Sequence, residues 1–447
     1  MVPLVELVVR NGRIVLPEGI VNGEISVENG RICRIAVSGL PKGDLEIDAK
    51  SRIIIPGAID AHAHLYDKKF LNREDFTSGS SAAAAGGVTT VIVMPLDSPF
   101  ISGPSIDEVI KLGCKKSVID FALHAGNMTP ESIKKVLEIN SLGIKSFKAF
   151  TCEPYQMSYD SIEELMIYVK AINGVAFVHA EDQKVLNKAA KNLREKRKDP
   201  LAHAESRTNE AEERAVRKVL ESSGRTGCRT HIAHVTARQS CEVIEKAKKK
   251  REHVSAETCP HFLVFTREDV EKKGPYLKVN PSLKLDGDRA ELWNALRKGI
   301  IDIVASDHAP ASKEEKEIGW TDIWEAPSGI PGVETLLPIM LSEGVGKGRL
   351  MLEQLVDSLC TKPALLFDLY PRKGVIQEGS DADLVILDFK EEVRISADRL
   401  HYKVGWTPYE GMKVKGVPTT TILRGSVVAE EGKILGSPGY GKFLARW

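Results

Sequence analysis

Two histidines stand two residues apart in the stretch IDAHAHL, which follows the apolar run RIIIPG. On a strand, side chains two residues apart point to the same face, so His62 and His64 can converge on one point. Convergent imidazole nitrogens are suited to binding a transition metal. The alternative is a chance pair of histidines in a loop. The other residues of the chain distinguish a metal-binding pair from a chance pair.

Further residues with metal-binding or catalytic side chains end apolar runs later in the chain. Because His231 and His234 lie an odd number of residues apart, we expect His234 to be a ligand and His231 to pack toward the helices. Histidine with aspartate forms a ligand set typical of zinc and related metals. The residues are Lys148 in SFKAF, His179 in FVHAE, His231 and His234 in THIAHVT, and Asp307 and His308 in ASDHAP.

Lys148 is the unusual member of this set. A protonated amine repels metal ions, so Lys148 could instead bind a substrate anion or lie on the surface. A neutral amine, however, can take up carbon dioxide to form a carbamate, whose negative charge could bridge two metal ions. The residues alone leave these alternatives open.

The apolar runs alternate with helical segments from Arg52 to about Val375. Eight such strand candidates, separated by helices that often begin at a Ser, Thr or Asp cap, predict a (β/α)8 TIM barrel. In such barrels the active residues gather at the carboxyl ends of the strands. A doubly wound sheet is the alternative, but the sequence lacks the Gly-rich phosphate loop expected after its first strand.

Both ends of the chain are rich in strands with little helical periodicity, and the Asn-Gly steps at residues 11–12 and 29–30 indicate hairpins. We therefore predict that residues 1–52 and 376–447 form one small β-sandwich domain. Residues 53–375 would form the barrel that carries the candidate metal ligands.

The composition excludes several partners. The 62 basic residues balance the 62 acidic ones, which argues against nucleic acid. The sequence shows neither a signal peptide nor an apolar run long enough to span a membrane. Seven cysteines lie scattered without paired spacing, which favours a reducing cytoplasm. We expect a cytoplasmic enzyme that acts on a small molecule.

Several motifs together resemble those of the cyclic amidohydrolases, the group of dihydroorotases, allantoinases and hydantoinases (dihydropyrimidinases) within the amidohydrolase superfamily. The resemblance extends over nearly the whole chain. The motifs are PGAIDAHAHL, AAAAGGVTTVIVMP, SFKAF, FVHAED, ETCPHF, NPSL, SDHAP, GIPGVETLLP and GSDADLVILD.

This resemblance implies two divalent metal ions, which we expect to be zinc. One ion would be held by His62, His64 and Asp307 and the other by His179 and His234, with a carboxylated Lys148 between them. A water shared by two metals loses a proton near neutral pH and can attack a ring carbonyl. Asp307 would be the catalytic residue that moves the proton from this water to the ring nitrogen.

The substrate is harder to predict. Dihydroorotases resemble this chain but hold the substrate carboxylate with arginine, asparagine and histidine, where this sequence has Tyr66, Leu96 and Ala311. Without that charge pairing, dihydroorotate should bind poorly. Hydantoinases carry a tyrosine five residues after the bridging lysine, where this chain has Glu153, with Tyr155 and Tyr159 nearby.

We therefore expect a neutral cyclic ureide such as allantoin, then dihydroorotate, then a hydantoin or dihydropyrimidine. The candidate substrate-binding residues are Tyr66, Asn280 in NPSL, and Ser328 and Gly329 in PSGIPGVE. An inactive scaffold of the same fold would be expected to lose ligands, and a one-metal deaminase-type enzyme would lack Lys148. The resemblance also suggests a homo-oligomer, either a dimer or a tetramer.

Overall fold

The computed structural model describes residues 5–66, 68–250 and 253–446. Its centre is a barrel in which the described residues form eight strands, all paired in parallel, in two runs with the orders β6-β7-β8 and β13-β12-β11-β10-β9. Parallel bridges Ala125–Phe147 and Ala63–His308 join the two runs and close the barrel. The predicted (β/α)8 fold is confirmed. The strands are β6 (Ala58–Ala63), β7 (Val88–Val93), β8 (Asp120–Leu123), β9 (Ser146–Phe150), β10 (Val175–His179), β11 (Arg229–Ile232), β12 (Val254–Thr258) and β13 (Ile303–Val304).

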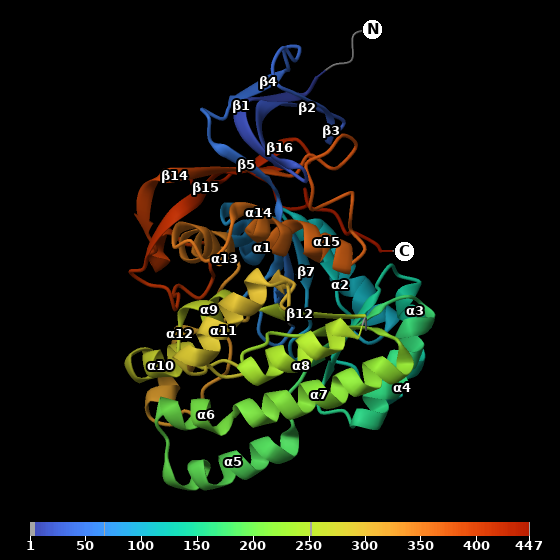
Figure 1. Ribbon diagram of the computed structural model, residues 1–447, viewed down its shortest axis with the longest axis vertical. Helices are drawn as coiled ribbons and strands as arrows, with labels where there is room; N and C mark the ends of the chain where they lie inside the picture. The colour runs from blue at the N-terminus through green and yellow to red at the C-terminus, as the bar shows by residue number, and fades with distance from the viewer. Residues whose placement is uncertain (1–4, 67, 251–252, 447) are drawn as a thin grey trace.

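Helices surround the barrel, and α5, α6 and α7 lie at the end of the molecule opposite the amino-terminal strands (Figure 1). None of the helices in the described ranges is both long and apolar enough to cross a membrane. The helices are α1 (Phe76–Ala85), α2 (Gly103–Lys116), α3 (Val136–Asn140), α4 (Tyr159–Ala171), α5 (Gln183–Lys196), α6 (Pro200–Ser206), α7 (Asn209–Thr226), α8 (Arg238–Lys249), α9 (Pro260–Val264), α10 (Arg267–Lys273), α11 (Asp286–Arg297), α12 (Lys313–Glu317), α13 (Leu336–Met340), α14 (Leu352–Val356) and α15 (Lys362–Leu366).

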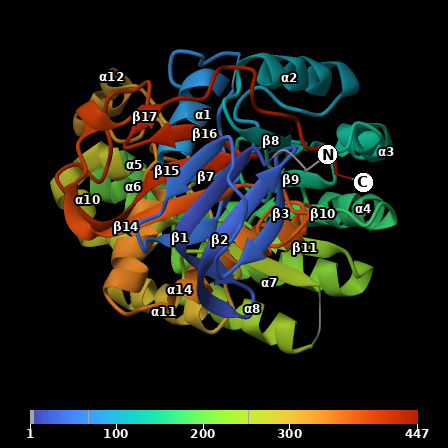
Figure 2. The ribbon, with the colours of Figure 1, turned by 90° about the horizontal axis from the view of Figure 1, so that it is seen from above.

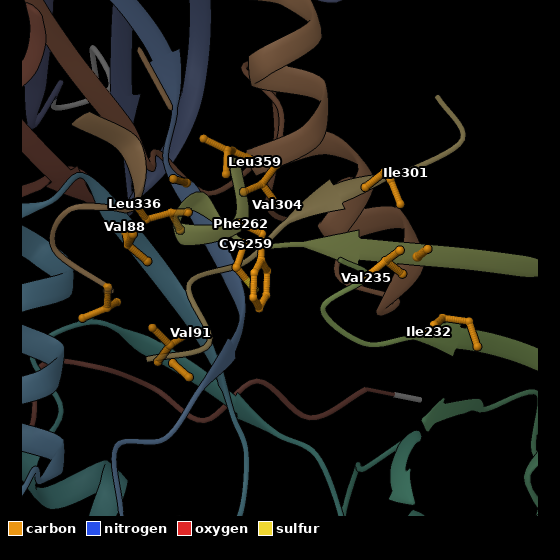
Figure 3. Close-up of a cluster of buried hydrophobic side chains, with 14 of the residues drawn as sticks. Val88, Val91, Ile232, Val235, Cys259, Phe262, Ile301, Val304, Leu336 and Leu359 are labelled. Carbon is orange, nitrogen blue, oxygen red and sulfur yellow. The ribbon is translucent and has the colours of Figure 1, made fainter. Parts of the chain in front are cut away.

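The barrel strands are apolar because they are covered on both faces. Strands β6, β7 and β8 are buried at every position, as expected for parallel strands that lie between a filled interior and a helical layer. Figure 3 shows part of the largest apolar cluster, where Val88 and Val91 of β7, Val304 of β13, Phe262 of α9 and Leu336 of α13 pack together. This packing fixes the strands whose carboxyl ends carry the candidate ligands.

Strands from both ends of the chain pair in one second sheet, seen at the top of Figure 1 and from above in Figure 2. The first and last parts of the chain meet where β5 pairs with β14, with Ile55 opposite Val385. We propose that this sheet is the core of the small domain expected at residues 1–52 and 376–447. Its strands are β1 (Leu7–Leu16), β2 (Gly19–Glu28), β3 (Arg31–Ala36), β4 (Leu45–Asp48), β5 (Ile53–Pro56), β14 (Leu384–Arg394), β15 (Lys413–Leu423), β16 (Ser426–Glu430) and β17 (Lys433–Ile434).

A buried group of charges joins this sheet to the amino-terminal end of the barrel. The ammonium Nζ of Lys373 lies 2.7 Å from carboxylate oxygens of both Asp120 and Asp383 and 3.0 Å from one of Asp381. Arg424 also pairs with Asp120, the first residue of β8. Each of these charges therefore has an opposite charge beside it, as a stable buried ion network requires.

Candidate metal centre

His62, His64 and Asp307 meet at the carboxyl-terminal rim of the barrel. His62 lies in β6, and His64 follows the strand. Asp307 Oδ1 lies 3.2 Å from His62 Nε2 and 3.6 Å from His64 Nε2. One possible ligand atom from each residue lies within 4.8 Å of the others. These three side chains can therefore hold a single metal ion together.

His179 and His234 form a second convergent pair beside the first. His179 is the last residue of β10, and its Nδ1 lies 3.0 Å from Nε2 of His234. The rings of His62 and His234 stack with their centroids 5.5 Å apart, so the two groups are neighbours. Burial lowers the pKa of His62 and of His234 well below the usual value, which keeps these imidazoles neutral, as metal binding requires.

Lys148 lies in β9 between these groups and carries an unsatisfied amine. Its side chain is buried, and Nζ has no hydrogen-bond partner among the described residues. The ammonium position lies 4.5 Å from the centre of the Phe177 ring and 5.3 Å from that of Phe150. Burial lowers the pKa of Lys148 to about 8. A buried lysine without an acceptor is costly, so this amine is suited to a reaction or a ligand that satisfies it.

All six predicted ligands line one cavity of about 140 Å³. The cavity therefore brings together side chains from β6, β9 and β10 and from the segments that follow β6, β11 and β13. The donor set, four imidazoles, one carboxylate and one buried amine, fits a pair of divalent metal ions once the amine carries a carboxylate.

Two of these residues adopt a backbone conformation that is rare for residues other than glycine. His234 has φ 34° and Asp307 has φ 47°. Left-handed conformations of this kind cost of order 1–3 kcal/mol and concentrate at functional sites. The turns place both side chains toward the cavity immediately after β11 and β13 end.

The expectation that His231 packs toward the helices is wrong. His231 lies inside the barrel, where its ring centroid is 4.6 Å from that of Phe177 and its Nδ1 bonds to Ser255 Oγ at 2.9 Å. Strand alternation does not extend to His234, because β11 ends at Ile232 and the chain turns before His234. Residues on the two sides of such a turn no longer alternate.

Two buried glutamates orient the histidines, and neither was assigned a role from the sequence. Glu257 Oε1 lies 2.5 Å from Nδ1 of His62, and Glu181 Oε2 lies 2.8 Å from Nε2 of His179. A carboxylate on the far nitrogen fixes the ring and its tautomer and leaves the other nitrogen free for metal. Glu257 lies in β12 and Glu181 lies two residues after β10, in the motifs ETCPHF and FVHAED already noted, which is the signal that could have identified them.

Arg207 completes the support of His179. Its guanidinium pairs with Glu181, and it also contacts the thiol of Cys152 at 3.9 Å. Burial alone would raise the pKa of Glu181, but Arg207 and His179 lower it well below its usual value. Glu181 therefore remains a carboxylate that can accept a hydrogen bond from His179.

His308, next to Asp307, is buried in a supporting position. Its Nε2 lies 3.0 Å from Glu74 Oε2, and its Nδ1 accepts a hydrogen bond from the backbone of Gly332 at 3.0 Å. The other histidines without an expected ligand role lie elsewhere: His124 bonds to Ser146 inside the barrel, and His401 pairs with Glu334.

The predicted substrate-binding residues divide into two groups. Asn280, Ser328 and Gly329 line the cavity with the candidate ligands. Gly329 already donates its backbone N–H to the carbonyl of Lys278 at 2.9 Å, so this amide is occupied. Its φ of 113° and the position of the Ala309 carbonyl, 2.2 Å from where a Cβ would stand, explain why the residue is glycine.

Tyr66 lies beside this cavity. It shares a narrow adjoining space with His64, Arg73 and Leu96, and its ring stacks on Phe76 with centroids 6.2 Å apart. The two tyrosines near Glu153 also separate. Tyr155 lines the candidate metal cavity and donates its hydroxyl to Asp97 at 2.5 Å, whereas Tyr159 bonds to Asp182 at 3.0 Å.

Comparison with known proteins identifies the family of this chain. The model of the amidohydrolase family matches residues 53–428, and the chain belongs to that family. It is 35% identical to an L-hydantoinase from Paenarthrobacter aurescens, covering 99% of this chain and 98% of the relative. It is 36% identical to a dihydroorotase from Methanosarcina acetivorans, covering 98% of this chain and 94% of the relative.

Solved structures give the same result. The L-hydantoinase (dihydropyrimidinase) from Arthrobacter aurescens superposes with a TM-score of 0.96 at 34% sequence identity, covering 99% of this chain and 100% of the other. A D-hydantoinase superposes with a TM-score of 0.93 at 33% identity, covering 98% of both chains. The expected membership of the amidohydrolase superfamily and the expected TIM barrel with a β-sandwich are therefore confirmed.

Proposed function

We propose that this protein hydrolyses a ring C–N bond in a hydantoin or dihydropyrimidine, using two divalent metal ions. The convergence of six ligand-type side chains on one cavity carries the proposal. The similarity to hydantoinases over nearly the full length supports the reaction class. The expectation of allantoin finds no such support, because the relatives reported above are hydantoinases and dihydroorotases, so we now rank the hydantoin-type ring first.

The residues that would hold the metal ions are those proposed from the sequence. His62, His64 and Asp307 would hold one ion, His179 and His234 the other, and a carboxylated Lys148 would link them. When bound, such a pair of ions polarises the ring carbonyl and makes a water nucleophilic near neutral pH. We expect zinc, because imidazole and carboxylate ligands suit it.

Asp307 would move the proton. Its carboxylate would accept a proton from the attacking water and deliver it to the ring nitrogen as the C–N bond breaks. The carbonyl carbon then becomes a carboxylate, and the ring nitrogen leaves as part of an open-chain ureide. Glu257 and Glu181 would hold His62 and His179 in place through these steps.

Dihydroorotate is the second candidate, because a dihydroorotase is among the relatives at 36% identity. The sequence argues against it, since the positions expected to bind the substrate carboxylate hold Tyr66, Leu96 and Ala311. An inactive scaffold is disfavoured because all six ligand residues are present. A one-metal enzyme is disfavoured because the chain has Lys148.

The test is a substrate panel with a metal count. Metal-loaded protein would be assayed on hydantoin, dihydrouracil, dihydroorotate and allantoin by detecting the open-chain product. We expect hydantoin or dihydrouracil to be hydrolysed fastest, with close to two metal ions per chain by elemental analysis. Activity on allantoin alone, or saturation with one ion, would contradict the proposal.

We further propose that the protein works in the cytoplasm as a homodimer or homotetramer. All seven cysteines are free of disulfides, which suits a reducing compartment. Sedimentation of the purified protein would test the oligomeric state, and a monomer would contradict it.

A further inference from the structure

A second and larger cavity, of about 560 Å³, opens beside the candidate metal cavity. We call it the outer cavity. The two cavities share five lining residues: Glu153, Pro154, Arg207, Asn280 and Ser328. The rest of the lining of the outer cavity comes from α5, from α6 (which contributes His203), from Lys278 and from Trp324. A substituent on a ring held at the metal centre can therefore extend into this space.

The outer cavity is strongly cationic. Its lining includes Lys191 and Arg194 of α5 together with Arg207 and Lys278, whereas Glu153 is the one acidic side chain among its described lining residues. Arg207 is neutralised by Glu181. The other three cations thus outnumber the acid in the wall.

The contacts of Arg194 and Lys278 are with neutral groups. The guanidinium of Arg194 lies 5.0 Å from the centre of the Trp324 ring, a contact that adds no negative charge. Lys278 donates to the backbone carbonyls of Ile323, at 2.6 Å, and Ala326. Burial lowers the pKa of Lys278 to about 8, so it remains mainly protonated at neutral pH.

We infer that the outer cavity binds a carboxylate carried on the substituent of the cyclic amide, with Arg194 and Lys191 as the residues that select it. This inference rests on the proposed function and names the substrate class more closely. A guanidinium pairs with a carboxylate through two parallel hydrogen bonds. The indole ring of Trp324, whose centroid lies 6.3 Å from that of His203, offers an apolar surface to the methylene groups of the substituent.

This site differs from the one that dihydroorotate would use. Tyr66 and Leu96 line space beside His64, on the side of β6 and β7. The outer cavity instead lies against α5 and α6, on the side of β9 and β10. A carboxylate attached directly to the ring would have to lie at the first position, whereas a carboxylate on a flexible chain can reach the second.

The test compares two substrates that differ only in charge. They are 5-(2-carboxyethyl)hydantoin and its neutral analogue 5-(2-carbamoylethyl)hydantoin. We expect the wild type to prefer the acid by about tenfold in kcat/KM at low salt, as a charge-assisted contact provides. Raising the salt concentration should reduce the preference, because Lys191 and Arg194 are exposed.

Arg194→Gln should lower this preference by about fivefold to tenfold, and Lys191→Gln by a smaller factor. Lys188→Gln is the matched control: Lys188 lies exposed on the same helix, outside the lining of the outer cavity, and its loss should leave the preference unchanged. An equal effect of Lys188→Gln would mean that only the general charge of α5 matters, which would overturn the inference.

Unsubstituted hydantoin separates the two proposals. If it is hydrolysed but the acid and the amide react equally well, the inference fails and the proposed function stands. If none of the cyclic amides is hydrolysed, the proposed function fails, and calorimetric binding of the two analogues tests the cavity alone. Tighter binding of the acid that Arg194→Gln abolishes would support the inference, and equal binding of both analogues would overturn it.

Discussion

The two ends of the barrel each bury a lysine, and the two lysines have opposite surroundings. At the amino-terminal end, Lys373 pairs with Asp120, Asp381 and Asp383. At the carboxyl-terminal rim, the Nζ of Lys148 has no hydrogen-bond partner among the described residues. Both side chains are at most 2% exposed, so burial is equal and only the partners differ.

The difference separates a structural charge from a functional one. Burial alone would lower the pKa of Lys373, but Asp383 and Asp120 raise it above its usual value. Burial lowers the pKa of Lys148 to about 8, against weaker effects of Glu257 and Asp307. The first lysine stabilises the folded protein as a cation. The second is costly as a cation and becomes useful as a neutral amine that can be modified.

The largest expected effect is the loss of activity in Lys148→Ala. Removing the link between the two proposed metal ions should lower kcat by about 10⁴-fold or more, because metal-assisted activation of water is lost. Short carboxylic acids such as acetate should restore part of the activity by replacing the missing carboxylate. Steady-state kinetics with and without added acid would measure the loss of activity and its rescue. A fully active variant would show that Lys148 has no role in catalysis.

Asp307→Asn should lower kcat by about 10³-fold, since it removes the proposed proton carrier. The amide oxygen can still bind metal, so elemental analysis should find the metal content nearly unchanged. Added acetate should not rescue this variant, which distinguishes it from Lys148→Ala. Near-normal turnover would exclude the proton-transfer role.

At the other end of the barrel, Lys373→Met should act on stability. It leaves Asp381 and Asp383 buried without their shared ammonium, which should lower the free energy of unfolding by about 3–5 kcal/mol. Chemical denaturation would measure the loss. The same substitution at exposed Lys415 of β15 should change stability by less than about 0.5 kcal/mol. Equal losses of stability in the Lys373→Met and Lys415→Met variants would contradict the structural role of Lys373.

The smallest effect has the opposite sign. In metal-free protein kept free of carbon dioxide, Lys148→Met should raise the free energy of unfolding at pH 7 by roughly 3 kcal/mol, because the wild type must bury a charged amine. The folded pKa of Lys148, about 8, lies below the unfolded value of 10.5. Between these pH values the unfolded state binds more protons, so the stability of the wild type rises and the advantage of the variant shrinks.

Denaturation curves at several pH values would measure this trend. A Lys148→Met protein that is less stable than the wild type at pH 7 would mean that Lys148, like Lys373, has a structural role. The conclusion that Lys373 has a structural role and Lys148 a functional one would then be wrong.

The sequence predicted the barrel and its rim because both depend on local patterns. Apolar runs alternate with capped helices, and the residues that end those runs meet in the folded barrel. His62, His64 and His179 lie where the strand pattern indicated.

The rest depended on distant contacts or on the ends of strands. The position of His231 was mispredicted because a turn follows Ile232. Glu257 is 195 residues from His62, and no local pattern connects them. The outer cavity combines α5 with residues near 280 and 324, so its charge became visible only when these segments were placed together.

The pairing of β5 with β14 has a consequence for how the protein is made. Strand β5 leads directly into β6, which carries His62, and one of its two neighbours in the sheet, β14, comes from more than three hundred residues later in the chain. During synthesis, the earliest histidines leave the ribosome long before the segment that braces them. Because domains generally complete folding as units, the candidate metal centre should be complete only after translation ends. Any binding of metal at this centre would thus follow the pairing of β5 with β14, late in the synthesis of the chain.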